Sequence, residues 1–182
     1  MSEEILTSNF FQLFGLPVSY DVDLDQIQQQ YMLLQKQFHP DKFANASDQA
    51  KRLSMQQTSW INEAQTTLKD PVLRASYLLK LNGVDFNFEN ETTKDVAFLM
   101  QQLEMREKLE NIKNEPESLE ILDDLAKELK VSASVLMEGF VKSFEVNNMD
   151  DAREWIRKLQ FMQKAKMEIT KLTADIEDEL MR

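Results

Sequence analysis

The sequence predicts an all-α protein with two helical domains. Only three of its 182 residues are glycine and four are proline, while 42% are hydrophobic. Leu, Gln, Glu, Lys and Met, which lose little rotamer freedom in a helix, are plentiful. Apolar residues recur three or four positions apart over long stretches, the spacing of one helix face. A chain of this length can bury one modest core or two small ones.

A brief apolar helix or turn and a first long helix are predicted for the start of the chain. Phenylalanine and leucine cluster over 10–16, and Gly15 and Pro17 end that cluster. After an acidic stretch, Asp23 can cap the free amides of a helix that begins near Leu24. The inward face of this helix carries Ile27, Tyr31, Leu34 and Phe38.

A proline ends the first long helix. Pro40 disfavours the α conformation at His39 and cannot donate a backbone hydrogen bond. A second long helix is expected over 48–69, followed by an Asp-Pro pair at 70–71 and a shorter helix that closes at an Asn-Gly pair. The inward side of the second helix carries Ala50, Leu53, Gln57, Trp60, Ile61, Ala64 and Leu68. Residues 1–83 therefore predict an antiparallel helical hairpin with short flanking helices.

A linker and a three-helix bundle are predicted for the rest of the chain. Residues 84–92 fall in a stretch without clear periodicity, where the charge also changes, and are assigned as the linker. Helices are expected at about 93–113, at about 117–147 with a kink near VSASV, and at about 150–181. Because the connections are short, neighbouring helices should be antiparallel, and residues 93–182 should form a bundle.

The charge and cysteine content exclude several classes of function. Residues 1–80 carry 7 basic and 9 acidic side chains, and residues 81–182 carry 14 and 23, for a net charge of −11. This field repels nucleic acid and anionic membranes. No apolar run approaches the roughly 20 residues of a membrane span, and the first residues are acidic where a signal peptide is basic. The lack of cysteine fits a reducing compartment. We expect a cytoplasmic protein.

The sequence offers no catalytic or metal-binding constellation. Its sole histidine, His39, lies in a predicted loop with no cysteine to activate and no evident serine–acid pair. The carboxylate pairs at 123–124 and 150–151 lack histidine support and are interpreted as solvated helix faces and caps. We therefore expect neither an enzyme nor a bound metal or cofactor.

Several motifs together carry a resemblance to a known family. They are FFQLFGLP near the start, QFHPDKF between the two long helices, INEAQTTLKDPVLRASYLL after it, and the acidic helical second half. Across nearly the whole chain this pattern resembles the HscB family, the J-domain co-chaperones of iron–sulfur cluster assembly. The resemblance implies that His39, Pro40 and Asp41 contact the ATPase domain of a DnaK-type chaperone, HscA, and stimulate its ATP hydrolysis.

The chemistry of the tripeptide fits that role. A rigid loop can present an imidazole and a carboxylate in fixed geometry, and Asp41 is suited to pair with a partner arginine. Lys36 and Lys42 are the nearby candidates for electrostatic docking, although J-domains usually carry more basic residues before the loop. The plainer alternative is that Asp41 merely caps the next helix and His39 is an ordinary loop residue.

A second departure from the family pattern lies in the helix after the loop. Gln65 stands where the family has an aromatic residue. Trp60, about a turn and a half earlier, is interpreted as filling part of that space.

The helix expected from Thr93 has two apolar faces. At about 100° per residue, its core stripe consists of Phe98, Met105, Leu109 and Ile112. Roughly opposite lie Val96, Leu99, Met100 and Leu103, and Glu107 and Glu110 continue that face. An apolar patch that runs into carboxylates suits a partner with an apolar centre and a basic rim. The alternative is that the bundle, or packing against the first domain, buries this face too.

The resemblance assigns the second face to a partner. HscB-like proteins hold the scaffold protein IscU on their C-terminal domain, and the matching positions are Leu99, Met100, Leu103, Glu104, Glu107 and Phe161. Phe161 lies about 100° from the apolar stripe of the last helix and is therefore expected to face outward. The prediction is a monomeric adaptor between HscA and IscU. The alternative is a J-domain co-chaperone for another client or for general protein folding.

Overall fold

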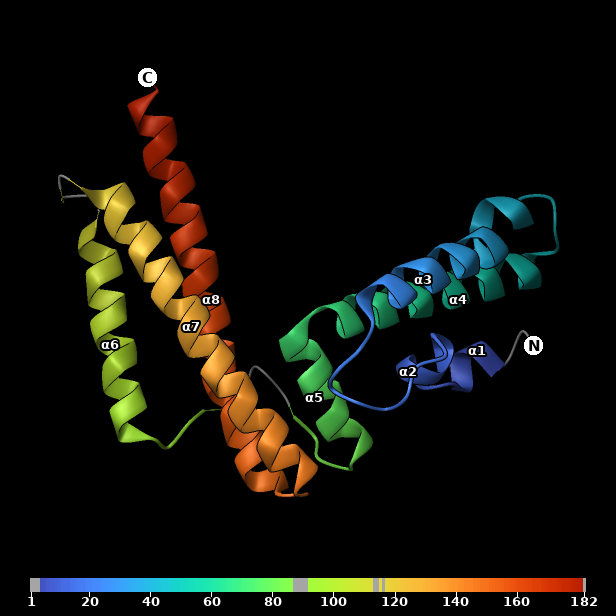
Figure 1. Cartoon of the computed structure of the whole chain (residues 1–182). Helices are drawn as coiled ribbons and strands as arrows, with labels where there is room; N and C mark the ends of the chain where they lie inside the picture. The colour runs from blue at the N-terminus through green and yellow to red at the C-terminus, as the bar shows by residue number, and fades with distance from the viewer. Residues whose placement is uncertain (1–3, 87–91, 113–114, 116, 182) are drawn as a thin grey trace. The chain divides into compact units, whose positions relative to one another are not determined.

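The protein is helical throughout the part that the computed structural model describes, which comprises residues 4–86, 92–112, 115 and 117–181. The chain divides into two compact units, Met1–Asn82 and Gly83–Arg182 (Figure 1). The predicted all-α class, with a helical hairpin followed by three long helices, is confirmed. Most of the predicted linker lies outside the described residues, so its bounds stay a prediction.

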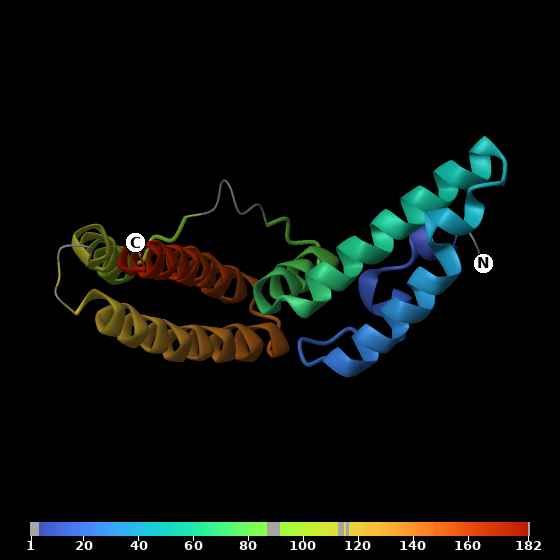
Figure 2. The same cartoon turned by 90° about the horizontal axis from the view of Figure 1, so that it is seen from above.

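The first unit is built around an antiparallel helical hairpin. Its elements are α1 (Glu4–Thr7), α2 (Phe10–Leu13), α3 (Leu24–Phe38), a 3-10 turn η1 (Pro40–Phe43), α4 (Asp48–Lys69) and α5 (Pro71–Leu81). Helices α3 and α4 run side by side in both views (Figures 1 and 2). The short helix α1 was not predicted, and η1 occupies part of the predicted loop.

Side-chain caps set the helix ends where the sequence predicts them. The Asp23 carboxylate accepts hydrogen bonds from the amides of Asp25 and Gln26, at 2.9 and 3.0 Å. Asp70 likewise caps α5, and Gly83 follows that helix with a φ of 78°, a left-handed conformation that favours glycine. These local interactions explain why α3 and α5 begin where they do and why α5 ends just before Gly83.

Aromatic packing joins the short N-terminal helices to the hairpin. The Phe10 ring stacks on Tyr77 with centroids 4.3 Å apart and meets the edge of Trp60 at 4.8 Å. Trp60 therefore packs against α2, and the interpretation that it also fills the space beside Gln65 stays a prediction. Gln65 instead donates a hydrogen bond to Gln28 of α3, at 3.2 Å. A polar contact between the hairpin helices thus stands where the family has an aromatic residue.

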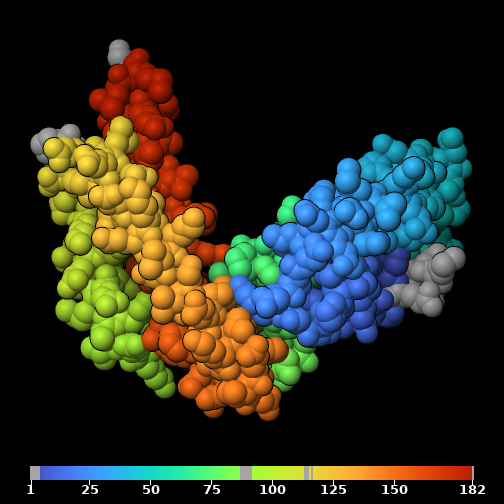
Figure 3. All heavy atoms as spheres, in the orientation of Figure 1, coloured from blue at the N-terminus to red at the C-terminus, as the bar shows by residue number. Residues whose placement is uncertain are grey.

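The second unit consists of α6 (Val96–Asn111), α7 (Ser118–Glu145) and α8 (Met149–Leu180). Helices α7 and α8 form the tightest pair, and α7 continues without a break through the VSASV stretch. A Cβ added to Gly139 would lie 2.6 Å from the Trp155 ring, so only glycine allows this close approach. The last turns of α8 extend past the neighbouring helices (Figure 3).

Helix α6 is attached to α8 at its N-terminal end. It begins at Val96 rather than at the predicted residue 93, because Asp95 provides the cap and accepts a hydrogen bond from the Phe98 amide at 3.1 Å. Lys158 of α8 donates to the second Asp95 oxygen at 2.6 Å. Hydrogen bonding to Lys158 lowers the pKa of Asp95 below its ordinary value. Helix α6 therefore approaches α8 more closely than it approaches α7.

The core of the second unit follows the predicted stripes. It includes Leu109, Ile112, Leu122, Leu125, Leu129, Ala165, Ile169 and Ile176. Each of the three long helices contributes to this one core. The unit is therefore a three-helix bundle, as predicted.

Candidate functional site: two binding surfaces

The His-Pro-Asp loop is anchored by two hydroxyl groups of α4. The carbonyl oxygen of Phe38, the last residue of α3, accepts hydrogen bonds from Ser54 at 2.7 Å and from Thr58 at 3.0 Å. Phe38 and Ser54 are buried. Since helix ends leave carbonyl groups unpaired, these hydroxyls satisfy a group that the loop would otherwise leave bare. The backbone just before His39 is thereby fixed to the hairpin.

The loop exposes its two polar side chains. The His39 side chain is 50% exposed and that of Asp41 is 90% exposed. His39 Nδ1 accepts a hydrogen bond from the Asp41 amide at 3.3 Å, which in a neutral ring leaves the proton on Nε2. The Asp41 carboxylate lies 3.5 Å from the same nitrogen. The loop thus offers a donor and an acidic acceptor in one small, proline-constrained turn.

The alternative that Asp41 serves as a helix cap is wrong. Helix α4 is capped by Ser47, which accepts from the Ala50 amide at 3.3 Å, and η1 is capped by the His39 side chain. The exposed Asp41 carboxylate has no such local duty in the described structure. This finding favours a role toward a partner.

The surface beside the loop is only weakly basic. Lys36 in the last turn of α3 and Lys42 in η1 are both exposed, as docking would require. The same helix also exposes Met32 and Leu33, which are 63% and 59% accessible. This pair of apolar side chains was not predicted, because they lie off the core stripe of α3.

The second apolar face of α6 is exposed. Leu99, Met100 and Leu103 are between 40% and 53% accessible, and Val96 is more so. The core stripe on the opposite side, which includes Phe98 and Leu109, is buried as predicted. The alternative that the bundle buries both faces is therefore wrong. Because soluble proteins rarely leave a row of large apolar side chains uncovered without a purpose, this face is a candidate binding surface.

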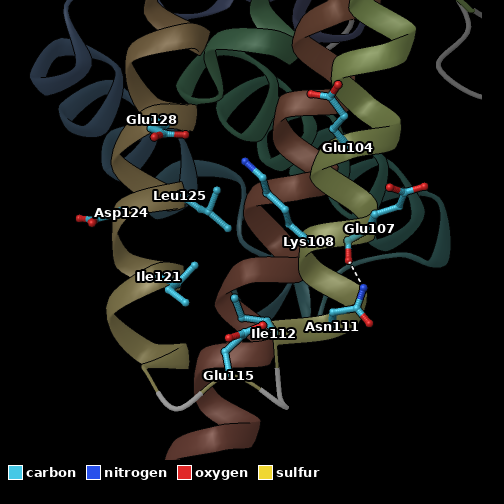
Figure 4. Close-up of a pocket in the computed structure, with 10 residues that line it drawn as sticks. All are labelled: Glu104, Glu107, Lys108, Asn111, Ile112, Glu115, Ile121, Asp124, Leu125 and Glu128. Carbon is cyan, nitrogen blue, oxygen red and sulfur yellow. Dashed lines mark hydrogen bonds between the residues drawn. The ribbon is translucent and has the colours of Figure 1, made fainter.

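An acidic groove runs between α6 and α7, beside that patch. It has a volume of about 660 Å³. Its lining comprises Glu104, Glu107, Lys108, Asn111, Ile112, Glu115, Ile121, Asp124, Leu125 and Glu128 (Figure 4). In the close-up, Ile121 and Leu125 point from α7 into the groove, and the Lys108 side chain projects from α6 into the gap. The groove therefore combines an apolar floor with a mostly acidic rim.

A second hollow extends the groove along α6. It has a volume of about 250 Å³ and shares Glu104, Lys108 and Glu128 with the first. Phe98 and Phe161 also line it, with their rings edge to face and 5.9 Å apart. The prediction that Phe161 faces outward is therefore wrong in part: this side chain is half-buried, because it packs on Phe98 of α6.

The predicted scaffold-binding residues thus fall into two adjoining groups. Leu99, Met100 and Leu103 form the exposed α6 patch, whereas Glu104 and Glu107 line the groove and Phe161 lines the hollow that extends it. The α7 side of the groove was missed. Its residues at 121, 125 and 128 recur at helical spacing, but only the tertiary structure brings them opposite α6.

The described residues contain neither a metal-binding cluster nor a membrane-spanning helix. Among residues 4–86, 92–112, 115 and 117–181, no group of three or more acidic, histidine or cysteine side chains could hold a metal ion. In the same part of the chain, no helix is long and apolar enough to cross a membrane.

Comparison with known proteins identifies the family. A DnaJ domain model matches residues 9–77, and a model described as the HSCB C-terminal oligomerisation domain matches residues 94–170. A curated relative from Shewanella halifaxensis, a co-chaperone protein HscB homolog, is 45% identical over 168 residues, covering 90% of this chain and 96% of the relative. The chain belongs to the HscB family. Its first unit is accordingly a J-domain, and its relatives are named as co-chaperones rather than enzymes.

Other members of the HscB family agree. A second homolog, from Shewanella woodyi, is 41% identical and covers 90% of this chain and 96% of its own. Among solved structures, the chaperone HscB from Vibrio cholerae matches with a TM-score of 0.83 and 35% identity, covering 95% of this chain and 99% of that one. Human co-chaperone protein HscB matches with a TM-score of 0.82 and 28% identity, covering 91% and 82%.

Proposed function

We propose that this chain stimulates ATP hydrolysis by a DnaK-type chaperone of the HscA kind and delivers the iron–sulfur scaffold IscU to it. In this way it aids the maturation of iron–sulfur proteins. One observation carries the proposal: an HscB-family chain joins an exposed His-Pro-Asp loop to a unit with an exposed apolar patch and an acidic groove. The chain acts as an adaptor, in the cytoplasm, and performs no chemical step itself.

The loop acts by presenting a preformed contact to the ATPase domain. A partner arginine pairs with the exposed Asp41 carboxylate, and His39 donates from Nε2. Pro40 and the anchored Phe38 carbonyl limit the conformations of the loop. A rigid loop loses less conformational entropy on binding, so more of the interaction energy appears as affinity.

Lys36 and Lys42 contribute electrostatic attraction at the edge of this contact. Because they are few, and because Met32 and Leu33 are exposed on the same helix, docking combines limited steering with apolar contact.

The scaffold binds to the α6 patch and the adjoining groove. Leu99, Met100 and Leu103 supply apolar area, and Glu104 and Glu107 supply charge at its border. Phe161 supports this surface from below through its contact with Phe98. The chain works as a monomer, since a second copy would carry the same strongly negative charge.

The proposal is tested with His39→Gln. This exposed substitution should abolish stimulation of the chaperone ATPase and leave the helical circular dichroism spectrum unchanged, because the glutamine amide oxygen can still accept from the Asp41 amide. Full stimulation by a folded variant would remove the assigned role of the loop. Stimulation by the natural chain without selective scaffold binding would indicate a J-domain co-chaperone for a different client.

A further inference from the structure

We propose that the groove between α6 and α7 holds a basic segment of the scaffold protein, with Glu128 of α7 forming the wall opposite Glu104 and Glu107. This inference rests on the proposed function and deepens it. It adds α7 to a binding surface that the resemblance confines to α6 and to Phe161 of α8, and it specifies the chemistry of the bound segment.

Continuity with the proposed scaffold surface is the first argument. Glu104 and Glu107 belong both to the residues assigned to scaffold binding and to the groove lining. Phe161, assigned in the same way, lines the hollow that extends the groove. A partner seated on Leu103 and its apolar neighbours therefore lies next to Glu104, which lines this groove, and a segment of the partner can enter it.

Charge complementarity is the second argument. Four glutamates and one aspartate line the groove, against the single lysine Lys108. The Asp124 carboxylate points away from the groove in Figure 4 and pairs with Lys127 at 2.9 Å, so it is not available to the bound segment. Glu128, in contrast, lines both hollows. The excess of carboxylates favours a cationic occupant and disfavours nucleic acid, an anionic membrane or a second copy of this acidic chain.

The shape of the groove indicates a lysine- or arginine-bearing segment rather than a small cation. Such side chains lay their aliphatic stems along apolar surface and keep the charged group near carboxylates. Ile121 and Leu125 provide the apolar floor, and Glu104 and Glu128 border it, whereas the Glu107 carboxylate points away from the gap (Figure 4). The resident Lys108 already extends a chain of this kind into the gap, and it competes with the partner for the same negative field.

Opposite substitutions in the groove test the inference. Glu128→Gln removes an attractive charge from the α7 wall and should weaken scaffold binding roughly threefold, the size expected for an exposed charge pair. Lys108→Gln removes the competing cation and should strengthen binding by a similar factor. The matched control is Glu138→Gln, an exposed glutamate of the same helix that does not line the groove, which should change binding little.

Binding is measured with full-length chain and purified scaffold protein by isothermal titration calorimetry at low and at moderate salt. The inference predicts that the Glu128 and Lys108 effects have opposite signs and that both shrink as salt rises. If the natural chain binds the scaffold but Glu128→Gln matches Glu138→Gln, the groove inference is overturned and the proposed function stands. If the natural chain binds no scaffold, the groove inference and the proposed scaffold-binding function are both contradicted. Unchanged melting temperatures exclude a folding defect as the cause.

Discussion

At the scale of single residues, the loop depends on side chains that are not part of its motif. Ser54 and Thr58 lie far from the His-Pro-Asp tripeptide in the sequence, yet both donate to the Phe38 carbonyl. Ser54 is only 1% exposed, so no bulk water replaces its hydrogen bond. A buried carbonyl without partners costs more than a hydrogen bond gains, which makes these two hydroxyls important for the geometry of the hairpin tip.

Removing both hydroxyls should therefore destabilise the first unit. The double variant Ser54→Ala, Thr58→Val leaves the Phe38 carbonyl without either donor and should lower the free energy of unfolding by about 1–3 kcal/mol. Urea denaturation monitored by circular dichroism measures this change. Ser59→Ala, at an exposed position of the same helix, is the control and should stay within about 0.5 kcal/mol. A double variant as stable as this control would contradict the assigned role.

At the scale of helices, local signals predicted most boundaries and long-range contacts explain the exceptions. Asp23 and Asp70 cap the helices that the sequence assigns to them. The start of α6 was misplaced by three residues, because Asp95 caps the helix, and the preceding Thr93 hydrogen-bonds to Glu154, 61 positions away. Phe161 was misjudged because its partner Phe98 lies on another helix. Helical periodicity contains no information about such contacts.

The contact between α7 and α8 should be sensitive to the size of residue 139. Gly139→Ala places a methyl group against the Trp155 ring, and overpacking of this kind costs about 1–3 kcal/mol. Alanine recovers up to about 1 kcal/mol through its helix propensity. We expect a net loss of roughly 1–2 kcal/mol in urea unfolding. Val131→Ala, at an exposed position of α7, should be nearly neutral. A stabilised Gly139 variant would show that the helices separate easily.

The attachment of α6 to α8 should depend on pH through Asp95. The Lys158 hydrogen bond lowers the pKa of Asp95 below 3.8, so ionised Asp95 stabilises the folded state above the unfolded pKa. This contribution is lost as pH falls through the lower, folded pKa. Asp95→Asn keeps an acceptor for the Phe98 amide but loses the charge. The variant should be less stable at pH 7, and the difference should shrink below about pH 4. A pH-independent difference in urea midpoint would contradict this.

At the scale of the whole molecule, the sequence predicted the architecture better than the second binding surface. The composition and the capping residues were enough to predict the helices and most of their ends. The motif that contains His39 predicted the loop between the two long helices of the first unit. The groove was missed because Glu128 and Leu125 face α6 only through the packing of the bundle. Sequence spacing predicts that two residues share a helix face, but it does not predict which helix that face meets.

The central claim is that one chain couples a chaperone ATPase to a scaffold through two separate surfaces. Steady-state ATP hydrolysis by the HscA-type chaperone tests it most directly, with the chain and IscU added separately and together. We predict stimulation well above the product of the separate effects. His39→Gln should abolish this response, whereas Leu103→Ala, an exposed change on α6, should retain stimulation by the chain and lose most of the synergy. Stimulation that is indifferent to IscU would contradict the adaptor function.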